Sequence, residues 1–314
     1  MAFVTPAQAL LIIPTFDSTI TSNANAGAYE AAINTAVETI DGLYSNPGTV
    51  QVLFEYNSAV NGQSDTTEYS LSYTDYTNLL TAASTAHPRN TVLSTAVANL
   101  SAGNKASTID ATSALLRVGL GLNAATGCLN AAGVCGTGGT YDSIVSVGNV
   151  GFSSNGPGLN IDAVSVLEHE LDEVLGGGGT GTTLGQNANG AIGPTDLYRY
   201  QSSGSTCADV DSTPSYTTDS SAVACYSIDG GKTSLVQMNE AGGGSDYGDF
   251  ANVGPAEIQD AFDPGPTPLY TDASPEFTMM ESIGYDAPEP ATLAMFSGAI
   301  TGLGWLRRRR TRRA

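Results

Sequence analysis

The sequence has 314 residues, which is enough for one large domain or two small ones with a sizeable hydrophobic core. It carries 31 acidic against 11 basic residues, for a formal net charge of −20, and six of the bases lie between Arg307 and Arg313. A body this acidic is repelled by nucleic acid phosphates, which argues against a DNA or RNA partner. The same charge is compatible with binding of cations such as calcium, with an extracellular setting, or with solubility alone.

The first nine residues contain Ala7-Gln8-Ala9, which has the A-x-A form of a signal-peptidase site. No basic segment and almost no apolar segment precede it. Either the true start codon lies upstream and residues 1–9 are the remnant of a truncated signal peptide, or this is not a signal peptide. The C-terminal features described below favour the first interpretation.

The body begins with alternating strand and helix patterns. A short apolar run predicts a buried strand over 10–13, helical periodicity predicts a long helix over 26–43, and period-two alternation predicts a strand over 50–56. Two shorter helices are expected over 75–83 and 90–100. This order predicts an α/β or α+β layer arrangement.

The four cysteines stand in two local pairs, Cys128 with Cys135 and Cys207 with Cys225. Three pairings are possible, and the local ones close the shortest loops, so we expect these two disulfides in an exported chain. A thiolate metal site is the alternative. It fits less well because neither spacing is C-x-x-C and no histidine is near.

Turn-rich segments separate the later elements. Residues 141–152 predict a strand or hairpin, residues 195–200 predict an extended segment, and an Asp-Gly-Gly-Lys turn predicts a β-hairpin over 222–238. The acidic, glycine-rich segment 242–250 is either a cation-binding loop or a solvated loop. The last helix of the body is expected within 275–285.

One helical segment, 163–175, carries the most chemistry. Its apolar residues share one face, and His169 and Glu173, four residues apart, lie on another. Asp162 stands at the N-cap position and Gly176 at the position of a C-terminal glycine. Because residues at i and i+4 are neighbours on a helix surface, one helix can offer two ligands to a metal ion while Glu170 reaches the attacking water.

This helix resembles the active-site helix of the zincin metallopeptidases, whose motif is H-E-x-x-H with the Glu as general base. Here Glu173 replaces the second His, and a carboxylate is an accepted zinc ligand. Gly176 matches the glycine of the metzincin extension H-E-x-x-H-x-x-G-x-x-H, whereas Gly179 stands in place of its third His. The resemblance implies a zincin-like mixed sheet with long helices, zinc bound by His169 and Glu173, and Glu170 as the catalytic base. An ordinary amphipathic helix with an acidic polar face is the alternative.

A catalytic zinc site has three protein ligands, so a third is required. Zincins outside the metzincin group take a Glu or Asp from a downstream segment, and Asp196 is the first acid after Glu173, beyond the glycine-rich loop 176–193. Asp196 is therefore the predicted third metal ligand; the alternative is a turn aspartate paired with Arg199. The other histidine, His87, precedes a proline between two predicted helices, where a surface or capping role is expected.

The C-terminal segment has three parts in order: the motif Pro288, Glu289, Pro290, an uncharged apolar run over 291–306, and an arginine cluster. Together they resemble the PEP-CTERM sorting signal, which an exosortase-type enzyme is expected to process in the cell envelope of Gram-negative bacteria. The sixteen uncharged residues would span about 24 Å as a helix, short for a bilayer core, which suits a transient anchor. A plain C-terminal anchor is the alternative; either places the body outside the cytoplasm.

The chain therefore divides into a possible signal-peptide remnant (1–9), a zincin-like α+β body (10–287) and a single-span sorting tail (288–314). The first functional hypothesis is an exported zinc-dependent metallopeptidase that acts on protein or peptide substrates. The second is a non-catalytic cell-surface or extracellular-matrix protein with a degenerate zincin fold, whose acidic body binds cations or polysaccharide. The third is a hydrolase that uses Glu170 and Glu173 without a metal.

Overall fold

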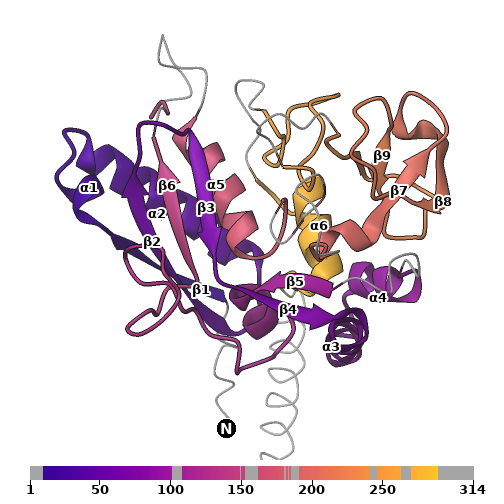
Figure 1. Ribbon diagram of the computed structural model, residues 1–314, viewed down its shortest axis with the longest axis horizontal. Coiled ribbons are helices and arrows are strands. Elements are labelled where there is room, and N and C mark those ends of the chain that lie inside the picture. Colours follow the sequence, from indigo (N-terminus) through magenta and orange to yellow (C-terminus); the bar gives the residue numbers. More distant parts are fainter. Residues whose placement is uncertain are drawn as a thin grey trace, which may run out of the picture.

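The structure is a computed structural model that describes residues 10–100, 108–148, 150–152, 162–179, 182, 184, 191–240, 246–262 and 270–288. Within these ranges the chain is a mixed α/β structure with more than one sheet (Figure 1). None of the helices in these ranges has the length and apolarity that a membrane crossing requires. The predicted signal-peptide remnant, and the sorting tail beyond Pro288, lie outside the described residues.

The main sheet has the strand order β1-β2-β6-β3. Strands β1, β2 and β6 run parallel, whereas β3 pairs antiparallel with β6 and is the last strand on that side. Helices α2 and α5 pack against each other, α2 also contacting β1 and α5 contacting β3 and β6 (Figure 1). The bounds are β1 (Leu10–Phe16), α1 (Ser18–Thr21), α2 (Ala26–Leu43), β2 (Gly48–Tyr56), β3 (Gly62–Thr66), β6 (Ser143–Val147) and α5 (Ala163–Val174).

Period-two alternation explains how β2 serves two cores. Val52 and Phe54 are buried in the main hydrophobic core. Leu53 points to the other face, where it joins Leu129 and Ile144 in a smaller cluster. Leu129 lies between the first two cysteines, so that loop covers part of the second face of the sheet.

A second sheet, of order β10-β9-β7-β8, lies on the far side of α6 from α5 (Figure 1). Helix α6 also packs on α4, and β4 pairs with β5 in a two-stranded sheet. The bounds of these elements are β4 (Glu68–Ser72), α3 (Tyr73–Ala86), α4 (Thr91–Ala98), β5 (Thr108–Thr112), η1 (Leu115–Gly119), η2 (Thr195–Tyr198), β7 (Arg199–Ser202), η3 (Cys207–Asp209), β8 (Val210–Pro214), β9 (Ala224–Tyr226), β10 (Val236–Gln237) and α6 (Pro275–Ile283).

The structure confirms the elements that were predicted from a strong hydrophobic period. It differs from the prediction where the segments are short or polar. The helix predicted over 26–43 is α2, and the hairpin predicted over 222–238 is the antiparallel pair β9 and β10. The segment 195–200, predicted to be extended, begins with the 3-10 turn η2 before it becomes β7. The strand β3 escaped prediction because it has no buried residue, so its sequence shows no apolar alternation.

Helix α5 has the predicted apolar face and the predicted ends. Leu167, Leu171 and Val174 are buried in the main core. Asp162 has extended backbone at the N-cap position, but its side chain accepts from Ser165 Oγ at 3.4 Å and caps no backbone N–H. Gly176 has a φ of +99°, a conformation that glycine adopts readily, and it ends the helix.

Both predicted disulfides are present. Cys128 is bonded to Cys135 and Cys207 to Cys225, with Cα–Cα distances of 4.7 and 5.7 Å. The first bridge lies in the loop that covers the smaller cluster, and the second joins η3 to β9. Bridges that persist require an oxidising compartment, which favours a location outside the cytoplasm.

Replacing Cys207 and Cys225 together with serine should lower the free energy of unfolding by about 3 kcal/mol, because the bridge closes a loop with a sequence separation of 18 residues. Urea denaturation of the oxidised proteins measures the difference. A variant in which all four cysteines are serine is the control. Reductant should destabilise the wild type and leave this control unchanged; an insensitive wild type would contradict the pairing.

Candidate metal centre

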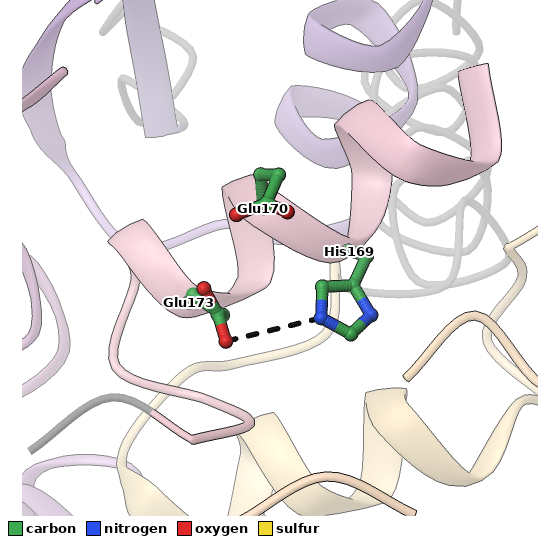
Figure 2. Close-up of side chains that lie close together, drawn as sticks. All are labelled: His169, Glu170 and Glu173. Atoms are coloured by element: carbon green, nitrogen blue, oxygen red, sulfur yellow. Dashed lines mark ion pairs between the residues drawn. The ribbon is translucent and has the colours of Figure 1, made fainter. Parts of the chain in front are cut away.

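Helix α5 presents its polar residues on two sides, because successive residues turn about 100° around the axis. His169 and Glu173 project from the same side, whereas Glu170 projects from another (Figure 2). The first side faces the segment 246–260, and Glu170 faces the start of β3. The helical spacing thus brings the two predicted ligands together.

The ligand atoms are spaced for a shared cation. His169 Nε2 lies 3.8 Å from Glu173 Oε1 and 3.9 Å from Asp249 Oδ1. Two ligands of a tetrahedral zinc ion lie about 3.4 Å apart when each is about 2.1 Å from the metal. The three side chains therefore need only small movements to meet at one ion.

The chain holds the imidazole of His169 in one orientation. Its Nδ1 lies 3.0 Å from the carbonyl oxygen of Ile258, which accepts the Nδ1–H. In the neutral imidazole this bond fixes the tautomer whose Nε2 carries the lone pair, and Nε2 is the nitrogen that lies near Glu173 and Asp249. Burial disfavours the charged form, yet the attraction of Asp249 and Glu173 together leaves the pKa of His169 above its ordinary value.

Acidic side chains from two segments gather around this histidine. Ligand atoms of Glu173, Asp246 and Asp249 lie within 4.8 Å of one another, as do those of His169, Glu170 and Glu173. Burial, opposed by the charge of His169, raises the pKa of Asp249 to about 7. Burial and the neighbouring Glu173 raise the pKa of Glu170 well above its ordinary value.

Glu170 occupies a buried position beside β3. It is almost fully buried, and its Oε2 has no hydrogen-bond partner among the described residues. A Cβ atom at Gly62 would lie 2.2 Å from Glu170 Oε1, so the glycine that opens β3 leaves room for this carboxylate. The carboxylate therefore lies between α5 and the outer strand of the main sheet.

Glycines allow the acidic segment to reach α5. A Cβ atom at Gly248 would lie 2.2 Å from the carbonyl oxygen of Gly178, and one at Gly179 would lie 2.3 Å from Asp246 Cβ. Position 179 is where the metzincin pattern has its third His. In this chain the segment that carries Asp246 and Asp249 packs directly against that position instead.

The structure does not bring Asp196 to this cluster. Its carboxylate is fully buried, its Oδ2 accepts from the N–H of Gly193 at 2.8 Å, and its Oδ1 lies 3.9 Å from Arg199 Nε. These are the contacts of the alternative interpretation, a turn aspartate paired with Arg199. The third acid beside His169 is Asp249, and the acidic composition of 242–250 was the feature of the sequence that pointed to it.

The remaining histidine also lies elsewhere. His87 forms an ion pair with Asp286, and its side chain is 35% exposed. It ends helix α3 as the C-cap residue, in agreement with the expected capping role. Only one imidazole is therefore available to the cluster.

Comparisons with protein family models, with curated proteins and with solved structures find no match for this chain. The functional argument therefore depends on the donor set itself. One imidazole nitrogen and at least two buried carboxylates suit a divalent cation. Among the described residues, two buried oxygens of the cluster, Glu170 Oε2 and Gln259 Oε1, have no hydrogen-bond partner, as expected of a site that takes a ligand.

The metal-free protein should lose stability as the pH rises from about 5 to about 7 in chelator. Burial raises the pKa of Glu276 and of Glu240 to about 7, above the ordinary carboxyl value of 4.5. The folded state then binds more protons than the unfolded state across this window, so the free energy of unfolding falls as the pH rises.

Denaturation in urea at successive pH values measures this slope. Glu276→Gln removes one titrating group while keeping an oxygen acceptor, so it should flatten the fall. Glu38→Gln, on the exposed side of α2, is the matched control and should leave the slope unchanged. A Glu276→Gln slope equal to that of wild type would contradict the assignment.

Proposed function

We propose that this protein is an exported metallopeptidase of the zincin type, with His169, Glu173 and Asp249 as ligands of one zinc ion and Glu170 as the general base. The observation that carries the proposal is the orientation of His169. Its Nδ1 is hydrogen-bonded to the carbonyl oxygen of Ile258, its Nε2 lies within 4 Å of both carboxylates, and a carboxylate oxygen of Glu170 lies within 4.8 Å of the ligand atoms of His169 and Glu173. A mixed sheet packed against the H-E-x-x-E helix also supports the zincin assignment.

The donor set favours zinc over calcium. Calcium takes six to eight oxygen ligands, whereas zinc is bound by imidazole nitrogen together with carboxylate oxygen. His169 stands in the middle of the candidate ligands, within 4 Å of both carboxylates. A site for calcium alone would leave this nitrogen without a role.

The chemistry divides between the cation and Glu170. When bound, zinc would polarise the scissile carbonyl and lower the pKa of a water molecule. Burial and the neighbouring Glu173 raise the pKa of Glu170, which makes its carboxylate a stronger base than an ordinary one. It would take the proton of the attacking water and pass it to the leaving amine.

The edge of the main sheet supports a peptide substrate. Strand β3 is the last strand of that sheet within the described residues, and Gly62 places its first residue against Glu170. An extended peptide can add to a sheet edge through backbone hydrogen bonds. A chain bound along β3 would bring one of its peptide bonds near Glu170.

Export remains a proposal from the sequence of the tail. The motif Pro288, Glu289, Pro290 with its apolar run and arginines would direct the protein to an exosortase-type enzyme in the envelope of a Gram-negative bacterium. The two disulfides agree with a final location at the cell surface or in the extracellular matrix.

Substitutions at the cluster should separate metal binding from catalysis. Asp249→Asn should lower zinc affinity by at least about 100-fold. Loss of a residue that only hydrogen-bonds a metal ligand already costs about 10- to 100-fold, and Asp249 is a proposed ligand itself. Glu170→Gln should keep the metal and lower hydrolysis of an unfolded protein substrate by about 10²- to 10⁴-fold. Metal content by mass spectrometry and peptide release measure the two effects.

Matched controls come from exposed acids. Asp272→Asn and Glu38→Gln make the same chemical changes on the surface and should alter neither quantity. Zinc binding without hydrolysis by wild type would favour the non-catalytic surface protein. Hydrolysis that survives complete removal of metal would favour the hydrolase that uses Glu170 and Glu173 alone.

The tail should direct sorting and then be removed. Replacing Arg307, Arg308, Arg309 and Arg310 with serine should leave the protein mis-sorted, because the positive charges hold that end in the cytoplasm. Cell fractionation and the mass of the mature protein measure the outcome. A variant with the location and mature mass of wild type would contradict the sorting proposal, while leaving the metal site untouched.

A further inference from the structure

The segment that supplies Asp249 also brings a glutamine into the candidate site. Gln259 is fully buried. Its backbone N–H donates to Glu276 Oε1 at 3.0 Å, and its carbonyl oxygen accepts from the N–H of Phe250 at 2.8 Å. The backbone N–H and C=O of Gln259 therefore both have hydrogen-bond partners, which fixes the point from which its side chain extends.

The amide of Gln259 lies between two of the candidate ligands. Its Nε2 lies 3.2 Å from His169 Nε2 and donates to Asp249 Oδ1 at 3.1 Å. Its Oε1 is buried and has no hydrogen-bond partner among the described residues. A Cβ atom at Gly178 would lie 2.2 Å from Gln259 Nε2, so the glycine makes room for the amide.

This arrangement suits the chain without a cation and is incompatible with one. The amide nitrogen lies against His169 Nε2 and Asp249 Oδ1, the same two atoms that a cation would use. When His169 Nε2 and Asp249 Oδ1 bind a metal, the amide nitrogen loses Asp249 as its acceptor and faces a positive charge. Rotation of the amide by half a turn would place Oε1 toward the ion and give the orphaned oxygen a partner.

We propose that Gln259 is the fourth protein ligand of the ion, binding through Oε1 at the position that a catalytic zinc site leaves open. This inference rests on the proposed function. Four protein ligands make a closed zinc site, and three make an open one. The resting site is therefore closed by a neutral and displaceable amide oxygen, and a substrate must displace Gln259 before the water can bind.

A fourth ligand predicts opposite effects on metal affinity and turnover. Gln259→Ala removes a donor, so zinc affinity should fall by about 10- to 100-fold while hydrolysis at saturating zinc rises. Gln259→Glu substitutes a charged carboxylate that is harder to displace, so affinity should rise and hydrolysis should fall. A purely structural glutamine would lower both quantities in both variants.

The experiment uses the full chain purified with its disulfides intact. Competition against a chelating dye measures zinc affinity, and the visible spectrum of the cobalt-substituted protein reports the number of ligands. Gln201→Ala and Gln201→Glu, at an exposed glutamine of β7, are the matched controls. The cobalt spectrum should change in Gln259→Ala and remain that of wild type in both controls.

The outcomes distinguish this inference from the function on which it rests. Unchanged affinity and cobalt spectrum in both Gln259 variants, with Asp249-dependent zinc binding intact, would overturn the assignment of Gln259 alone. A wild type that binds no zinc would overturn the metal centre itself. Opposite shifts of affinity and hydrolysis in the two variants would support a closed resting site.

Discussion

The burial of acidic side chains on both sides of α5 is the constraint on which the rest of the structure depends. The four acids of α5 that are almost completely buried are Glu168, Glu170, Asp172 and Glu173, and burial raises the pKa of each. A buried carboxylate is stable only when it is protonated, hydrogen-bonded or close to a cation. The elements packed around α5 meet this requirement in different ways on its two sides.

On the far side, Asp172 Oδ1 accepts from the hydroxyl of Tyr270 at 3.1 Å, and the Tyr270 hydroxyl is hydrogen-bonded to that of Tyr44 at 2.6 Å. Hydroxyl groups thus bond one oxygen of Asp172 and bring no positive charge, whereas Asp172 Oδ2 has no hydrogen-bond partner among the described residues.

The near side has a different composition. His169 is the group whose charge lowers the pKa of both Glu173 and Asp249, and it stands among several carboxylates. One imidazole cannot neutralise them all, whereas a divalent cation can, and it would use the nitrogen and the oxygens together. The difference between the two sides of one helix thus separates a structural network from a candidate functional site.

Arg199 connects the interior of the second sheet to this site. It is fully buried, and it pairs with Glu240 Oε1 at 2.5 Å and lies near Asp196. The same guanidinium donates to the carbonyl oxygen of Tyr247, within the turn that carries Asp249. Asp196 and the turn that carries Asp249 therefore lie against the same guanidinium, although Asp196 is not a ligand in this arrangement. Breaking one member of a buried ion network leaves an uncompensated charge, so this anchor is expected to be rigid.

The sequence by itself determined what depends on local geometry. The spacing of His169 and Glu173 on one helix, the long helix α2, and two disulfides over short loops all follow from periodicity or short loop length. Only the tertiary structure decided that Asp249 and not Asp196 joins the histidine, that β3 borders the site, and that Gln259 enters it. Gln259 and His169 are 90 residues apart in the chain. Gly178, Gly179 and Gly248 allow their two segments to approach closely, and glycine has no side chain that would contribute to a hydrophobic pattern. Such contacts depend on how separate segments pack, and no local period in the sequence encodes that packing.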